Sequence, residues 1–196
     1  MTGQRQGPPV VHLIVGLPGA GKTTRAKELE VSESALRFTP DEWQLMLFGD
    51  QNPPDKRDLV EGKLIHLGMR AAELGTNVVL DFGFWGTDER SALRWIAAAV
   101  GARSQVVYLP IDPDEQRRRV TDRFATTPGH TFHMSDVELE QWRAQFQAPD
   151  DEELRGGPIP PAPPGHATWS AWASQRWPSL PDQYAGPDVG TGEPYC

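Results

Sequence analysis

The pattern of apolar and polar positions along this chain alternates between short apolar runs, typical of buried strands, and segments with the apolar period of a helix. The apolar run Val10–Val15 ends at a glycine, which is the pattern of a buried strand that feeds a tight turn. The residues after Lys22 have helical composition, and a second short strand is predicted at Ala35–Phe38. The first forty residues therefore predict strand, loop, helix and strand.

A long amphipathic helix is predicted over Asp55–Leu74, and Gly75 is its natural stop. Its apolar side chains recur at offsets of four and three residues, at Val60, Leu64, Leu67, Ala71 and Leu74. Asn77–Asp81 (NVVLD) then forms an unbroken apolar run closed by an acid, which is typical of a parallel strand covered on both faces.

The same alternation continues to about residue 148. It predicts a helix from Thr87 to Gly101, a strand at Gln105–Leu109, a helix at Pro113–Phe124, and a last helix that starts with a capping box at Ser135 and ends near Ala148. Strands that alternate with helices imply right-handed crossovers and a parallel sheet between helical layers. We therefore predict a three-layer α/β domain over residues 1–148.

The character of the chain changes beyond residue 148. Residues 149–196 contain ten prolines, seven acids and only two bases, and the prolines argue against a helix or a central strand. This predicts a mostly irregular, acidic tail. The tail nevertheless holds Trp169, Trp172 and Trp177, which is unusual for a solvated linker, so we expect it to dock, most simply on its own domain.

Overall composition limits the classes of function. No apolar run approaches the roughly 20 residues that a membrane span needs, and the first residues lack the apolar core of a secretory signal, so a cytoplasmic protein is expected. The net charge of −8 argues against a broad nucleic-acid footprint, which depends on clustered Lys and Arg. Small substrates fit this balance better, although nucleic acid is not excluded.

A phosphate-binding motif follows the first strand. GLPGAGKT, from Gly16 to Thr23, fits the pattern G-x-x-x-x-G-K-[ST] and lies between a strand and a helix, where its glycines let backbone N–H groups point at phosphate oxygens. Lys22 would reach the β and γ phosphates, and the Thr23 hydroxyl would ligate Mg²⁺. The alternative is a glycine-rich turn with a chance lysine. We predict that ATP with Mg²⁺ is bound by Gly16, Pro18, Gly19, Ala20, Gly21, Lys22, Thr23 and Thr24.

Two acids follow the ends of predicted strands. Asp41 lies just past the second strand and Asp81 ends the third, and ligands in open α/β sheets bind at these carboxyl ends. Asp41 could accept the proton of an attacking hydroxyl, or it could simply cap a helix. Asp81 could orient Mg²⁺ through water or bind substrate, or it could be a turn residue at the strand end.

Four arginines crowd the helix predicted at Pro113–Phe124. Arg119 and Arg123 are four residues apart and share a face, whereas Arg117 and Arg118 lie beside acids of the same helix. Leading into the segment 125–134, they are typical of a lid whose arginines stabilise the transferring phosphoryl group. The alternative is a solvated basic face paired with neighbouring acids.

Four motifs within residues 10–148 resemble the small P-loop kinases (AAA_33-like), which include the kinase domain of phage-type polynucleotide kinase, chloramphenicol phosphotransferase and zeta toxins. The motifs are GLPGAGKT, TPDEW at 39–43, VVLDFGFWGTDER at 78–90 and DPDEQRRRVTDR at 112–123. The resemblance implies a P-loop kinase fold, and we expect four strands in the order 2-3-1-4 with room for a fifth. It also implies that Asp41 is the general base, that Asp81 is the strand-three acid, and that Arg119 and Arg123 are the lid arginines.

Two features depart from the polynucleotide kinase pattern. That pattern has an arginine shortly after the catalytic acid, whereas this chain has Gln44. The segment after the third strand is also aromatic, and Trp85 suits stacking on a ring or sugar face, although core packing is the alternative. Arg90 could touch an anionic group or lie on the surface. The predicted substrate residues are Asp81, Trp85 and Arg90.

The function predicted from these residues is an ATP-dependent kinase. Its acceptor would be a hydroxyl of a small metabolite, sugar nucleotide or antibiotic, with Asp41 as base and with Lys22, Mg²⁺, Arg119 and Arg123 stabilising the phosphoryl group. A nucleic-acid 5′-hydroxyl kinase is one alternative. A switch or interaction module that binds or hydrolyses ATP is another. The sequence predicts no oligomeric state.

Overall fold

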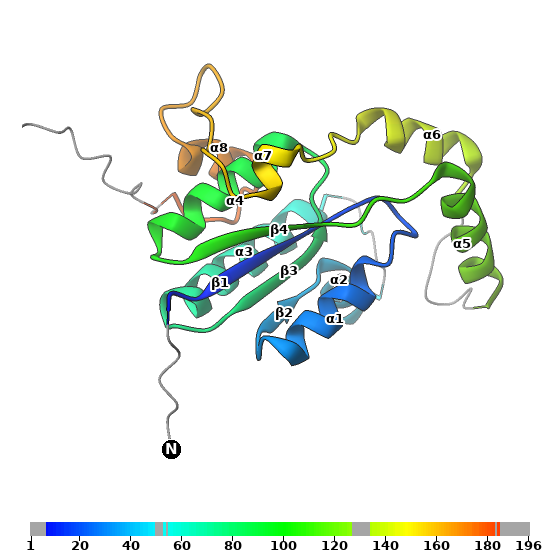
Figure 1. Cartoon of the computed structure of the whole chain (residues 1–196), viewed down its shortest axis with the longest axis horizontal. Coiled ribbons are helices and arrows are strands. Elements are labelled where there is room, and N and C mark those ends of the chain that lie inside the picture. The colour runs from blue at the N-terminus through cyan, green and yellow to red at the C-terminus, as the bar shows by residue number, and fades with distance from the viewer. Residues whose placement is uncertain (1–6, 50–52, 54, 127–133, 183, 185–196) are drawn as a thin grey trace, which may run out of the picture.

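The centre of the molecule is a four-stranded parallel sheet. The computed structural model describes residues 7–49, 53, 55–126, 134–182 and 184. Within this part of the chain the strands are ordered β2-β3-β1-β4, as Figure 1 shows. Their bounds are β1 (Val10–Val15), β2 (Leu36–Phe38), β3 (Val78–Gly83) and β4 (Arg103–Tyr108). The predicted order of the four strands is confirmed, and no fifth strand joins them among the described residues.

Helices cover both faces of the sheet. Side chains alternate along β1, so Leu13 faces one helical layer and Ile14 faces the other. On the Ile14 side, α1 (Lys22–Ser32) packs its buried Ala26 and Leu29. On the opposite side lie α3 (Arg57–Glu73) and α4 (Thr87–Ala99) (Figure 1). The three-layer prediction is confirmed, and β1 and β3, buried on both faces, account for the unbroken apolar runs.

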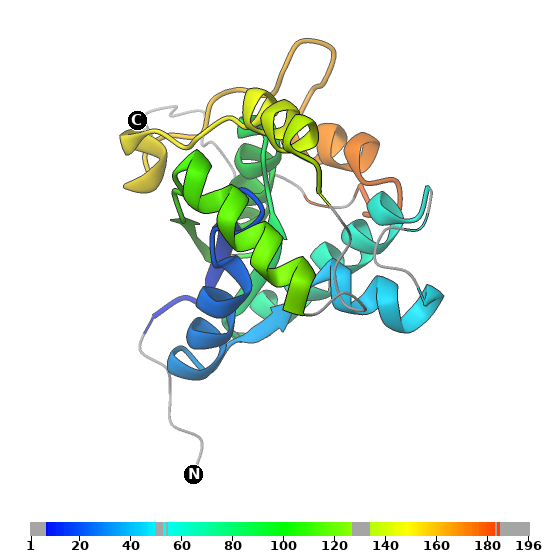
Figure 2. The same cartoon turned by 90° about the vertical axis from the view of Figure 1, so that its right-hand side faces the viewer.

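Three further helices surround the carboxyl ends of the strands, which Figure 2 views from that end. They are α2 (Pro40–Phe48), α5 (Pro113–Thr126) and α6 (Asp136–Gln145). The predicted capping box precedes α6, where the Glu138 amide donates to Ser135 Oγ over 3.3 Å and the Ser135 amide donates to Glu138 Oε2 over 2.8 Å. Most of the expected lid segment, residues 127–133, lies outside the described residues.

The C-terminal segment, which is the tail from residue 149 on, forms two short helices, so the prediction that its prolines exclude helix was wrong, although most of its described residues are irregular as predicted. The two helices are α7 (Asp151–Leu154) and α8 (Trp169–Arg176). Residues 165–177 contain no proline, and Thr168 Oγ1 caps α8 by accepting a hydrogen bond from the Ala171 amide over 3.1 Å. The prediction used the proline count of the whole segment, which does not show that these residues lack proline.

Tryptophans of the C-terminal segment belong to the main core. α8 packs on α4, and Trp169 and Trp177 are buried in the same cluster as Leu13 of the central strand. Trp177 also donates its indole N–H to Glu61 Oε2 of α3 over 3.0 Å. The segment therefore covers apolar surface of α3 and α4 that would otherwise face water.

A glycine permits this packing. A Cβ placed on Gly62 of α3 would collide with Ser179 Oγ and would lie 3.0 Å from the Leu180 amide nitrogen and 3.1 Å from Trp177 Cβ. Backbone of the C-terminal segment thus contacts backbone of α3 at one helical position that has no side chain. Within the described part of the chain, no helix combines the length and the apolar character needed to cross a bilayer.

Replacement of Trp177 by alanine should lower the free energy of unfolding by about 3–5 kcal/mol, because it leaves a cavity in the core and removes a partner of Glu61. Urea denaturation followed by circular dichroism measures the change. Trp43, whose exposed fraction is 38%, is the matched control, and its alanine variant should lose far less. Equal losses for the two variants would contradict the packing described for the C-terminal segment.

Candidate functional site

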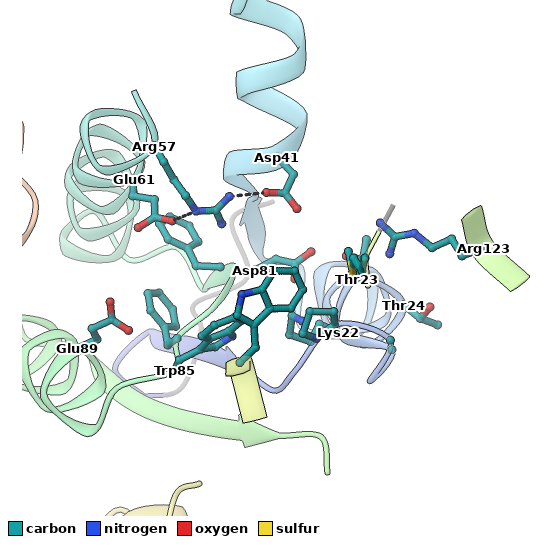
Figure 3. Close-up of a pocket in the computed structure, with 18 of the residues that line it drawn as sticks. Lys22, Thr23, Thr24, Asp41, Arg57, Glu61, Asp81, Trp85, Glu89 and Arg123 are labelled. Atoms are coloured by element: carbon teal, nitrogen blue, oxygen red, sulfur yellow. Dashed lines mark hydrogen bonds and ion pairs between the residues drawn. The ribbon is translucent and has the colours of Figure 1, made fainter. Parts of the chain in front are cut away.

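A cleft of about 730 Å³ opens at the carboxyl ends of the strands. Its lining side chains fall into two groups of opposite net charge. In Figure 3, Lys22, Thr23 and Arg123 lie on one side of Asp81, and Arg57, Glu61 and Glu89 lie on the other. The basic half is formed by Lys22, Thr23, Thr24, Arg119 and Arg123. The acidic half is formed by Asp41, Arg57, Glu61, Glu89 and Arg176.

The loop between β1 and α1 has a conformation that its glycines permit. A Cβ on Gly16 would lie 2.8 Å from the Leu109 carbonyl oxygen, and Gly19 and Gly21 have φ angles of +83° and +87°, in the left-handed region. Lys22 is the first residue of α1, so the loop ends at a helix N-terminus, where N–H groups and the helix dipole favour an anion. Of the eight predicted nucleotide-binding residues, all but Gly16 and Ala20 line the cleft.

Lys22 is folded back against this loop. Its Nζ donates to the Leu17 carbonyl over 2.9 Å, and a Cβ on Gly83 would come within 3.3 Å of its Cε. Burial lowers the pKa of Lys22 to about 8, although the carboxylates of Asp81 and Asp41 favour its charged form. Gly83 is a residue that sequence reasoning missed, because only the fold shows that β3 passes so close to the lysine stem.

Asp81 lies at the centre of the cleft beside the loop. Burial raises its pKa, while the Thr23 hydroxyl, Arg37 and Lys22 favour the carboxylate. Arg37 NH1 is 3.4 Å from Asp81 Oδ2. Mg²⁺ in phosphoryl-transfer sites is held by one or two oxygen ligands of the protein together with phosphates. The adjacent Thr23 hydroxyl and Asp81 carboxylate fit that requirement.

Asp41 is the second residue of α2 and lies in its first turn. Its side chain is 59% exposed, and Oδ1 is 3.0 Å from Arg57 NH1 of α3. Arg57 in turn reaches Glu61 Oε1 with its Nε at 2.8 Å. Figure 3 shows both contacts as dashed lines.

The four arginines of α5 separate into two pairs. Arg117 and Arg118 are paired with acids on the exposed side of α5, Asp114 for Arg117 and Glu115 and Asp122 for Arg118. Arg119 and Arg123 instead line the cleft. Arg119 donates to the Gly19 carbonyl over 3.2 Å and also contacts Glu115. The structure thus brings the pair predicted as lid arginines next to the phosphate-binding loop.

Of the residues in the acidic half, only Asp41 was predicted from the sequence as a site residue. Glu61 is buried, with 7% of its side chain exposed, and burial raises its pKa although Arg57 and the Trp177 indole N–H favour the charged form. Glu89 comes from α4, and Arg176 comes from α8. The apolar stripe predicted for α3 did not include Glu61: the buried face of this helix contains Glu61, Ile65 and Met69, whereas Leu67 and Leu74 of the predicted stripe are exposed. Nothing in the neighbouring sequence indicates that Arg176 lines the cleft, because its position depends on how the C-terminal segment packs on the domain.

Aromatic side chains also line the cleft. The Trp85 and Trp142 rings have centroids 5.9 Å apart and are tilted by 52°. Phe82 and Phe84 stack at 5.1 Å, and Phe84 is buried in the core. Trp85 therefore lies where stacking on a ligand was predicted, whereas Phe84 serves core packing.

Arg90 does not occupy the place predicted for it. Its side chain is fully buried and lies outside the cleft lining, so it is neither a surface residue nor a substrate contact in this structure. Arg90 forms an ion pair with Glu153 of α7, with Nε–Oε1 and NH2–Oε2 distances of 2.6 and 3.0 Å. It also donates to the carbonyls of Phe84 and Trp85. The cause is the C-terminal segment, whose Glu153 compensates the buried guanidinium.

Gln44 is fully buried in α2 and does not line the cleft. The position at which polynucleotide kinases carry an arginine for substrate phosphate therefore faces the interior here. Gln44, which departs from the polynucleotide kinase pattern in the sequence, therefore cannot contact a ligand in the cleft.

Comparisons with known proteins agree with this fold. The model of the AAA domain family AAA_33 matches residues 11–149. No match was found among curated protein sequences. Among solved structures, a chain of the Pnkp1/Rnl/Hen1 RNA repair complex is similar with a TM-score of 0.60 and 18% identity over 74% of this chain. This chain spans only 46% of that longer one.

Two other solved structures are similar over most of their length. A candidate kinase from Chloroflexus aurantiacus j-10-fl has a TM-score of 0.58 and 19% identity, with 82% of this chain and 85% of that chain covered. APE1195 has a TM-score of 0.52 and 20% identity, with 89% and 95% covered. These likenesses establish the P-loop kinase-like fold.

Nucleotide binding should be coupled to proton uptake above pH 8. Phosphates beside Lys22 raise its pKa from about 8, so the free protein must gain a proton on binding and affinity should fall as pH rises further. Calorimetry of ATP binding at pH 8–9, in two buffers of different ionisation enthalpy, measures the uptake. It should persist when the exposed Lys27 is replaced by methionine. ATP binding without proton uptake would contradict the lowered pKa of Lys22 in the free protein.

Proposed function

We propose that this chain, which belongs to the AAA_33 family of small P-loop kinases, is an ATP- and Mg²⁺-dependent kinase that phosphorylates a hydroxyl group of a small molecule. The observation that carries the proposal is the division of one cleft. Its basic half combines a phosphate-binding loop, Lys22 and two arginines, and a carboxylate suited to act as a base lies at the border of its acidic half.

Asp41 is the proposed general base. Arg57 contacts its Oδ1, and among the described residues Oδ2 has no hydrogen-bond partner, so this oxygen is available to accept a proton. As the acceptor hydroxyl loses its proton to Asp41, its oxygen bonds to the γ-phosphorus. The bond from that phosphorus to the β–γ bridging oxygen breaks, and ADP leaves with the electron pair.

The basic half would stabilise the charge of the transferring group. Lys22 and the N-terminus of α1 face the phosphates, and Arg119 and Arg123 approach from α5 on the other side of the loop. Thr23 and Asp81 would hold Mg²⁺, which when bound neutralises charge on the β and γ phosphates. Positioning and electrostatics account for most of the catalysis expected in this class of reaction.

Two alternatives have less support. A nucleic-acid 5′-hydroxyl kinase shares the fold, and Pnkp1 belongs to an RNA repair complex. The acceptor side of this cleft, however, carries paired carboxylates, and Gln44 is buried outside the cleft lining. A switch that only hydrolyses ATP would not need a second half of the cleft. Phosphate transferred to an oligonucleotide end would favour the first alternative, and hydrolysis that no acceptor stimulates would favour the second.

The variant Asp41→Asn should lower turnover by a factor of about 10² or more while ATP affinity stays close to that of the wild type, because only proton transfer is removed. A coupled assay of ADP release gives the rate, and calorimetry gives the affinity. Asp88→Asn is the matched control, since Asp88 is exposed on α4 and lies outside the cleft. A wild-type rate in Asp41→Asn would remove Asp41 from the mechanism.

The variant Lys22→Ala should behave differently from Asp41→Asn. It removes the charge that contacts the β and γ phosphates in both ground and transition states, so both ATP affinity and turnover should fall. The same two measurements separate the outcomes. Unchanged ATP affinity in Lys22→Ala would contradict the assignment of the Gly16–Thr23 loop as the donor site.

A further inference from the structure

An unbroken set of ion pairs connects the proposed base to the C-terminal segment. Asp41 contacts Arg57, Arg57 contacts Glu61, and Glu61 Oε2 lies 3.9 Å from Arg176 NH2. Residues of α2, α3 and α8 therefore share one polar wall of the cleft, although residues 41 and 176 lie far apart in the sequence.

Arg176 is the centre of this wall. Its Nε and NH2 lie 3.0 and 2.9 Å from Glu89 Oε1, and its NH1 lies 2.7 Å from Asp58 Oδ1. Its guanidinium carbon also lies 5.3 Å from the centroid of the Trp177 ring, which is buried in the core. The guanidinium thus fixes carboxylates of α3 and α4 in place, and core packing fixes the guanidinium.

The wall carries excess negative charge. Three carboxylates of the cleft lining, those of Asp41, Glu61 and Glu89, share the two guanidinium groups of Arg57 and Arg176, and Arg176 also contacts Asp58, which lies outside the lining. A phosphate entering this half would have to displace a carboxylate from an arginine or face like charge. The basic half of the same cleft has the opposite balance. The basic half is thus suited to a polyanionic ligand, and the acidic half is suited to a ligand that is not polyanionic.

The carboxylates keep capacity for a ligand. Glu89 accepts from the Gly86 amide over 3.1 Å and from two nitrogens of Arg176, and a carboxylate has about four acceptor positions. Glu61, Glu89 and Trp85 all line the cleft. Carboxylates beside an aromatic face can bind hydroxyl or ammonium groups carried by a ring.

We propose that the C-terminal segment completes an acceptor subsite, in which Arg176 holds Glu61 and Glu89 to bind a ring compound that carries hydroxyl or ammonium groups and no phosphate. This inference rests on the proposed kinase function and names its class of acceptor. Glu61, Glu89 and Trp85 contact the acceptor, whereas Arg176 is a positioning residue that acts through the two glutamates.

The test of the ligand class uses acceptors that share a scaffold and differ in charge. ADP release is measured with glucose, glucosamine and glucose 6-phosphate, and with adenosine and adenosine 3′-monophosphate. Calorimetry of the wild-type chain with a non-hydrolysable ATP analogue measures acceptor binding without turnover. The neutral or amino member of a set should bind and be phosphorylated at least about 10-fold better than its phosphorylated member. Preference for a phosphorylated member would overturn the proposal.

The test of the C-terminal segment compares two arginines of that segment. Arg176→Met should raise the acceptor KM by about 10-fold or more and leave ATP affinity unchanged, because the glutamates lose their partner. Arg176→Lys should recover part of the loss, and Arg155→Met, at an exposed arginine outside the cleft, should match the wild type. Equal acceptor KM values for Arg176→Met and Arg155→Met would overturn the positioning role.

A second variant displaces the segment without altering any charge. Gly62→Ala adds only a methyl group, which favours the helix itself but collides with Ser179 and Leu180. It should raise the acceptor KM in the same direction as Arg176→Met. If the KM is unchanged in a folded Gly62→Ala protein whose C-terminal segment has become protease-sensitive, the segment is not part of the subsite.

These results separate the inference from the proposed function. Should Asp41→Asn retain turnover while the acceptor preference and the Arg176 effects hold, the assignment of the base is wrong and the subsite stands. If Asp41→Asn lowers turnover while neither Arg176→Met nor Glu89→Gln changes the acceptor KM, the kinase assignment stands and the subsite is wrong.

Discussion

The separation of opposite charges within one cleft is the constraint on which the site depends. Strand ends of the parallel sheet bring Lys22, Asp81 and Asp41 together, and a partly buried cleft strengthens every interaction among them. A polyanionic ligand beside Lys22 is compatible with these charges. The carboxylate of Asp41, at the border of the acidic half, is compatible with them too. The same arrangement would not serve two polyanionic ligands, so the charge division itself orients donor and acceptor.

The C-terminal segment gives this charge division its support. Trp177 and Trp169 bury the segment in the same core as the sheet, and Glu153 and Arg176 extend from it to compensate charges on α4 and α3. Breaking a buried pair from one side leaves an uncompensated charge, which is strongly destabilising. The segment therefore combines a packing role with a direct position in the cleft wall. Its connection to the proposed base, through Glu61 and Arg57, gives this proline-rich stretch a place in the proposed chemistry.

Much of the fold could be read from the sequence because its signals are local. The apolar runs at Val10–Val15 and Asn77–Asp81 report strands buried on both faces, and the Gly16–Thr23 motif requires a loop between strand and helix. The donor half of the cleft followed from that motif and from the spacing of Arg119 and Arg123. Its remaining element, Gly83, was missed because its role depends on the close approach of β3 to the side chain of Lys22 in α1.

The acceptor half could not be read in the same way. Glu61, Glu89 and Arg176 come from three helices, and only tertiary packing brings them into one wall. Arg90 was misplaced for the related reason that its partner, Glu153, lies 63 residues away in the segment predicted to be irregular. Interactions at such separations leave no periodic pattern in the chain, so sequence reasoning named the donor half and left the acceptor half incomplete.

The fate of a labelled γ-phosphate tests the central claim most directly. The enzyme is mixed with ATP carrying ¹⁸O in its γ-phosphoryl group and with the neutral and amino acceptors, and the products are resolved by mass spectrometry. The account predicts an acceptor phosphate ester that retains the label, formed together with an equal amount of ADP. Label found only in inorganic phosphate, at a rate that no acceptor changes, would contradict it.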